Sequence, residues 1–127
     1  MKHKILIVED DESLREMYLF KLVLENYSVD TAINGIDGYE KAKLLLPDLI
    51  LLDIKMPLMN GDEMLQKVRS QSWGSTIKVI ILTNLSRREA PMNLNLLNVS
   101  RYVVKAHTTP SQIITTMREV LGGKQKK

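Results

Sequence analysis

Four strand-like segments of the chain each end abruptly in polar residues whose types suit metal or phosphate chemistry. The segments cover residues 5–8, 49–52, 78–82 and 103–104. The polar residues that follow them are Glu9, Asp10, Asp53, Thr83 and Lys105. In an open parallel sheet the carboxyl ends of the strands share one edge, and ligands bind in the crevice there. We therefore expect these side chains, distant in sequence, to meet in one pocket.

The chemistry of such a pocket follows from its carboxylates. Three carboxylates held together at neutral pH either raise one another's pKa or hold a cation. A cluster of hard oxygen donors without His or Cys favours magnesium over zinc or copper. A carboxylate can also attack a phosphoryl group to form an aspartyl-phosphate, a step that needs mainly positioning and charge neutralisation. Around Asp53, a magnesium ion and the Lys105 ammonium would supply that positive charge, and the Thr83 hydroxyl would supply a hydrogen bond.

Strand-like and helix-like segments alternate five times along the chain, which predicts an α/β fold with a parallel sheet and helices on both faces. The expected strands cover residues 5–8, 28–32, 49–52, 78–82 and 102–104. The expected helices cover residues 13–23, 37–46, 61–70, 89–97 and 110–121. Capping residues mark the starts of two helices. Either Asp11 or Ser13 caps the first helix, and Thr109-Pro110 begins the last.

Length, charge and cysteine content narrow the class of protein. The chain has 127 residues, which suits one domain, and no cysteine, which excludes disulfides and fits a reducing cytoplasm. Basic residues number 18 and acidic residues 15, and three lysines in the last four residues account for the whole excess. We expect a domain over residues 1–122 and a basic tail or linker stub over residues 123–127, with no direct nucleic-acid binding. No segment has the length and apolarity of a membrane span.

Longer motifs around these residues match a known family. Residues 7–11 read Ile-Val-Glu-Asp-Asp, residues 51–57 read Leu-Leu-Asp-Ile-Lys-Met-Pro, and residues 56–61 read Met-Pro-Leu-Met-Asn-Gly. With Thr83, Tyr102 and Lys105 in order behind them, the chain resembles response regulator receiver domains over essentially its whole length. The resemblance implies the flavodoxin-like (βα)5 fold known as CheY-like, with strand order 2-1-3-4-5.

The resemblance also implies a role for each site residue. Asp53 is the implied phosphoacceptor, and Glu9, Asp10, Asp53 and the backbone carbonyl of Lys55 are the implied Mg²⁺ ligands. By the same resemblance the Thr83 hydroxyl turns toward the phosphoryl group, Tyr102 changes rotamer with it, and Lys105 pairs with the phosphoryl oxygens.

The chain departs from the family pattern in three places. Lys105 is followed by Ala106, where the family usually has a proline after a cis peptide bond. A non-proline cis bond costs about 2.5–4 kcal/mol, so the bond is either trans or strained. Asn84 replaces a residue that is commonly small, and residues 92–101 lack the usual Gly-Ala stretch before the last strand.

Two functions from different classes remain open. The resemblance favours a two-component signalling domain that is phosphorylated by a sensor histidine kinase or a histidine phosphotransfer protein. Such a domain would change the surface formed by its fourth helix, fifth strand and fifth helix for an unknown output partner. It is not an enzyme on a separate substrate, because it catalyses only its own phosphorylation and dephosphorylation. The alternative is a receiver-like interaction module that works without phosphorylation. The sequence also leaves open whether the chain forms a homodimer through the face of its last helix.

Overall fold

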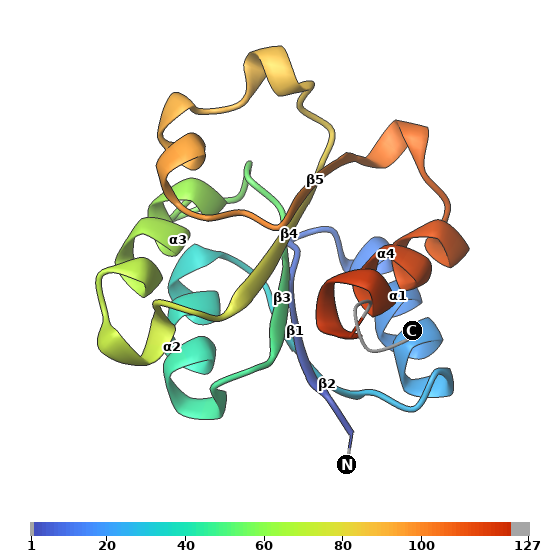
Figure 1. The fold of residues 1–127 in the computed structure, drawn as a ribbon. Helices are drawn as coiled ribbons and strands as arrows, with labels where there is room; N and C mark the ends of the chain where they lie inside the picture. The colour runs from blue at the N-terminus through green and yellow to red at the C-terminus, as the bar shows by residue number, and fades with distance from the viewer. Residues whose placement is uncertain (1, 123–127) are drawn as a thin grey trace.

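The computed structural model describes residues 2–122 and contains one five-stranded parallel sheet in the order β2-β1-β3-β4-β5 (Figure 1). The strands are β1 (Lys4–Val8), β2 (Ser28–Ala32), β3 (Leu49–Leu52), β4 (Lys78–Thr83) and β5 (Arg101–Val104). The predicted α/β fold and the implied strand order are confirmed. The central strands β1, β3 and β4 are almost entirely buried, as expected for continuous apolar runs covered on both faces.

Helices cover both faces of the sheet (Figure 1). On one side lie α1 (Glu12–Leu24) and α4 (Pro110–Gly122), which pack on alternate residues such as Ile7 and Leu51. On the other side lie α2 (Gly35–Leu45) and α3 (Gly61–Arg69), which pack on Leu6 and Leu52. Successive strand residues point to opposite faces, so each strand contributes to two separate cores.

The expected helix over residues 89–97 is wrong. The chain there forms two short 3-10 turns, Arg87–Glu89 and Met92–Leu96, so the described residues contain four α-helices rather than five. Pro91 lies between the two turns, and asparagine, a weak helix former, recurs beyond it. Arg69 binds the end of the segment instead, donating to the carbonyls of Leu97 and Asn98 at 2.8 and 3.1 Å.

The helix starts follow the capping rules. Asp11, not Ser13, caps α1, because its side chain accepts a hydrogen bond from the Leu14 N–H at 3.0 Å. At the start of α4, Thr109 and Gln112 exchange reciprocal hydrogen bonds of 2.9 and 3.2 Å between side chain and backbone. This capping box is the predicted one.

One aromatic cluster lies on the α2–α3 side of the sheet. Trp73, in a 3-10 turn over Ser72–Gly74, packs against Tyr39 with ring centroids 5.8 Å apart. The Lys67 ammonium lies 4.7 Å from the centre of the Tyr39 ring.

Within residues 2–122 no helix combines the length and the apolar composition that a membrane crossing needs. The predicted tail, residues 123–127, lies outside the described residues.

Candidate functional site

Three carboxylates meet at the carboxyl edge of the sheet. The register pairs Val8 with Leu52, so the residues that follow β1 and β3 leave the sheet at the same level. Ligand oxygens of Glu9, Asp10 and Asp53 lie within 4.8 Å of one another. Glu9 and Asp53 are buried, with 5% and 7% of their surface exposed, whereas Asp10 faces solvent. The cluster is therefore open on one side.

Lys105 reaches this cluster from the end of β5. Its Nζ donates to Asp53 Oδ2 at 2.9 Å and forms an ion pair with Glu9 Oε1 at 2.7 Å. No cis peptide bond occurs among residues 2–122, so the Lys105–Ala106 bond is trans. The lysine thus reaches the acidic pair without the cis proline that usually follows it in the family.

Burial and ion pairing act against each other in this cluster. Burial raises the pKa of the Glu9 carboxyl, and the hydrogen bonds from Lys105 and from the Asp11 N–H only partly offset it. Burial lowers the pKa of the Lys105 ammonium, but its hydrogen bonds to Asp53 and Glu9 more than offset that effect, so the net direction is upward. A charged Glu9 therefore depends on a cation beside it.

The backbone around Asp53 is held by close packing. The Ile54 N–H donates to Asp53 Oδ1 at 2.7 Å, and the Gly61 N–H donates to the Ile54 carbonyl at 2.7 Å. A Cβ at position 61 would overlap the Asp53 carbonyl oxygen, so only glycine fits there. Gly61 belongs to the family-like Met-Pro-Leu-Met-Asn-Gly motif, but nothing in the sequence indicates this contact.

Arg15 is a second residue that the sequence reasoning missed. From the first turn of α1, its Nη1 donates to the backbone carbonyl of Glu9 at 2.9 Å and approaches that of Asp10 at 3.4 Å. The contact fixes the backbone that carries both acidic side chains. Arg15 lies seven residues after the end of β1, and no sequence motif indicates this role.

The remaining predicted residues, Thr83, Tyr102 and Lys55, differ in burial and in hydrogen-bond partners. Thr83 ends β4 and is 1% exposed, and its Oγ1 accepts from the Leu85 N–H at 3.4 Å. The Tyr102 hydroxyl donates to the carbonyls of Leu85 and Ser86 at 2.8 and 3.2 Å. The Lys55 side chain is exposed. Thr83 and Tyr102 therefore both bind the backbone of Leu85.

The fold and the edge site define a doubly wound α/β domain with a lysine-bound carboxylate cluster at the ends of its strands. Residues 5–118 match the family model described as response regulator receiver domain. The chain belongs to this family, as its resemblance in sequence predicts.

Relatives and solved structures agree with this placement. The response regulator ArlR of Staphylococcus aureus is 42% identical over 80 residues, which cover 63% of this chain and 35% of ArlR. The hybrid signal transduction histidine kinase D of Dictyostelium discoideum is 36% identical over 101 residues, 80% of this chain and 6% of the kinase. The chain thus spans only a small part of these relatives. A CheY-like receiver domain protein from Methanospirillum hungatei superposes with a TM-score of 0.87 at 28% identity, covering 99% of this chain and 98% of that one.

Proposed function

We propose that this receiver domain is phosphorylated on Asp53 in a Mg²⁺-dependent reaction, by a sensor histidine kinase or a histidine phosphotransfer protein of the cytoplasm. The observation that carries the proposal is the buried Asp53 carboxylate, which lies within 4.8 Å of two further carboxylates and 2.9 Å from the Lys105 ammonium. On this proposal residues 1–122 form the switching domain, and residues 123–127 are a tail or linker.

The donor set fits magnesium. Glu9, Asp10 and Asp53 offer only carboxylate oxygens, the hard donors that Mg²⁺ prefers, and the backbone carbonyl of Lys55 is the proposed fourth protein ligand. When bound, Mg²⁺ neutralises charge on the oxygens of the transferred phosphoryl group. In the proposed reaction a carboxylate oxygen of Asp53 forms the new P–O bond as the P–N bond to the donor histidine breaks.

Lys105 and Thr83 act on the product of this reaction. The Lys105 ammonium, already placed on the Asp53 carboxylate, pairs with a phosphoryl oxygen, and the Thr83 hydroxyl donates a hydrogen bond to another. Lys55 and Leu85 flank the expected route of the water that later attacks the phosphorus. The domain's own residues therefore set both the formation and the lifetime of the aspartyl-phosphate.

The Leu85 backbone supports a route from the site to the surface. Its N–H binds the Thr83 hydroxyl and its C=O accepts from the Tyr102 hydroxyl. When Thr83 turns toward the phosphoryl group it breaks the first of these bonds, which frees the loop that holds Tyr102. Release of this loop on phosphorylation then shifts the population of conformations at β5, the neighbouring 3-10 turns and α4, where we place the output partner.

Incubation with acetyl phosphate and Mg²⁺, followed by intact-mass measurement, tests the proposal. We expect one phosphoryl adduct on the wild-type chain and none on Asp53→Asn or in the presence of EDTA. An adduct that persists in Asp53→Asn would place the acceptor elsewhere and overturn the assignment.

The second candidate is a receiver-like interaction module that does not use phosphorylation. The departures at Asn84 and Ala106 motivate it, because both residues flank groups that would handle the phosphoryl group. This function requires that no adduct forms with acetyl phosphate or with a phosphorylated histidine phosphotransfer protein. The same mass measurement therefore separates the two candidates.

A further inference from the structure

The outer edge of β5 is a free sheet edge. β5 is the last strand in the sheet order and pairs only with β4. The Ser100 N–H donates to the Val79 carbonyl at 2.8 Å. Backbone groups alternate in direction along a strand, so the N–H and C=O groups of Tyr102 also point toward β4. The N–H and C=O groups of Arg101 and Val103 point outward. Among residues 2–122 no backbone hydrogen bond outside the β4 ladder uses residues 101–104.

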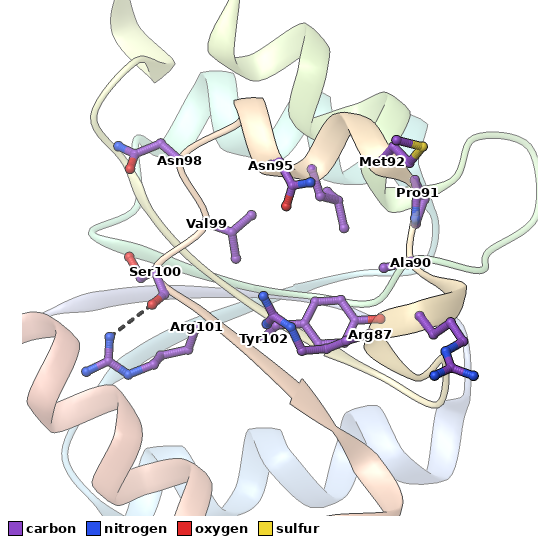
Figure 2. Close-up of a pocket in the computed structure, with 12 residues that line it drawn as sticks. Arg87, Ala90, Pro91, Met92, Asn95, Asn98, Val99, Ser100, Arg101 and Tyr102 are labelled. Atoms are coloured by element: carbon purple, nitrogen blue, oxygen red, sulfur yellow. Dashed lines mark hydrogen bonds between the residues drawn. The ribbon is translucent and has the colours of Figure 1, made fainter.

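A hollow lies on each side of this edge. The first, of about 620 Å³, lies under the 3-10 turns that replace the expected helix (Figure 2). Its lining residues include Arg87, Arg88, Asn95, Val99 and Tyr102. The second, of about 570 Å³, lies between β5 and α4. Its lining residues include Val103, His107, Gln112, Thr115 and Thr116.

The two hollows match the repeat of an added strand. Side chains of a β-strand point alternately to the two faces of the sheet, so a segment paired with β5 directs successive side chains into the first and the second hollow. Strand addition of this kind draws affinity from main-chain hydrogen bonds and specificity from pockets for alternate side chains. A helix docked on β5 would use one hollow and leave the outward N–H and C=O groups of Arg101 and Val103 unpaired.

Charge selects the occupant. Arg87 lines both hollows, Arg88 lines the first, and no Asp or Glu lines either hollow. Arg101, on the strand itself, forms an ion pair with Glu119 at 3.9 Å, so Arg87 and Arg88 carry the charge argument. Within the described part of the chain, Arg88 forms no ion pair, and Arg87 lies over the Tyr102 ring at 5.1 Å. A second copy of the chain would bring these arginines against their own kind. Charged edge residues disfavour such self-pairing.

We propose that the outer edge of β5 accepts an extended, acidic segment of a partner protein as a sixth strand. Acidic side chains of the segment lie toward Arg87 and Arg88 in the first hollow. Small aliphatic or hydroxyl side chains lie against Val103 and Thr115 in the second. This inference rests on the output surface proposed above and names the partner for it. Because Tyr102 lines both hollows, the segment touches the residue whose hydroxyl binds the Leu85 loop.

The test uses the full 127-residue chain and labelled ten-residue peptides that alternate Asp or Glu with Val or Thr. Each peptide is also made in two N-methylated forms, one methylated on odd and one on even residues. A strand pairs through only one of its two edges, so one form should lose at least tenfold in affinity while the other binds like the parent. Fluorescence anisotropy gives the affinities, and amide NMR shifts should locate the peptide at residues 101–104.

Variants of the chain test the charge argument. Arg88→Glu should weaken binding at least fivefold, because it places an acid where the peptide carries one. Lys43→Glu, on the exposed surface of α2, changes charge equally and should leave affinity unchanged. Circular dichroism of both variants should match that of the wild-type chain, as a control that the fold is kept.

Equal losses in both methylated forms, NMR shifts that avoid β5, or absence of binding across the peptide set would each overturn the proposal. Saturation of the first hollow by free glutamate, with no gain from a peptide backbone, also overturns it and indicates a small-anion site. The peptides are tested against wild type and Asp53→Asn without a phosphoryl donor. Failure of phosphorylation therefore leaves this test intact.

Discussion

Replacing Lys105 with methionine removes the ammonium that lies between two buried carboxylates. The lysine side chain is 15% exposed, and those of Glu9 and Asp53 are 6% and 8% exposed, so solvent screens these contacts little. Removing one partner of a buried ion pair costs about 3–5 kcal/mol, because a buried charge stays behind. Methionine keeps most of the apolar stem, so lost packing adds little.

The expected loss lies at the lower end of that range, near 3 kcal/mol. Glu9 keeps its hydrogen bond from the Asp11 N–H, and Asp53 keeps its hydrogen bond from the Ile54 N–H, so neither carboxylate loses all its partners. In the Asp53→Asn background one of the two charges is gone. The same Lys105→Met change should then cost at least about 1 kcal/mol less, a coupling typical of residues in contact.

Urea unfolding in EDTA, followed by far-UV circular dichroism, measures both values. Lys43→Met, which removes an exposed lysine from α2, is the control and should change the free energy of unfolding by less than about 0.5 kcal/mol. A Lys105→Met loss as small as that of the control would refute the reasoning. So would an equal loss with and without the Asp53 carboxylate, since the cost would not arise from their contact.

Four further outcomes follow from the site and its surroundings. Gly61→Ala should cost at least about 2 kcal/mol in urea unfolding, because its Cβ overlaps the Asp53 carbonyl oxygen. Arg69→Met should cost about 2–4 kcal/mol in the same assay, since three carbonyls lose a charged donor. The pKa of the Glu89 carboxyl is lowered by hydrogen bonds with the backbone and the side chain of Ser86. These hydrogen bonds should therefore persist above pH 4.5 and break as the pH falls through the lowered pKa. The Ser86 amide shift in an NMR titration reports this, and Glu89→Gln should flatten it. Leu85→Glu should speed loss of the phosphoryl group several-fold by intact mass, and an unchanged rate would count against Leu85 as a barrier to water.

The fold was predictable because its strongest signals are local. Residues 49–52 form an unbroken apolar run, which is typical of a strand buried on both faces of a parallel sheet. Thr109, Pro110 and Gln112 specify a helix start through their own hydrogen-bonding groups. The meeting of the acidic residues was predictable because the carboxyl ends of parallel strands share one edge, and β1 and β3 do end at paired positions.

The error over residues 89–97 has a physical cause. Leu94 and Leu97 are both buried and three residues apart, a spacing that fits an α-helix and a 3-10 turn equally well. The choice between them depends partly on Arg69, whose hydrogen bonds reach Leu97 and Asn98 across 28 and 29 residues. Contacts at that separation leave no periodic trace in the sequence. The same applies to Arg15 and to the crowding at Gly61.

The position of Trp73 means that its fluorescence reports on only one of the two cores. It is the sole tryptophan, and it belongs to the core that α2 and α3 cover, while the core under α1 and α4 contains none. Indole emission therefore monitors one half of the molecule, whereas helical ellipticity averages over both. If the halves melt together the two signals coincide, and a partly opened state with one intact layer would separate them.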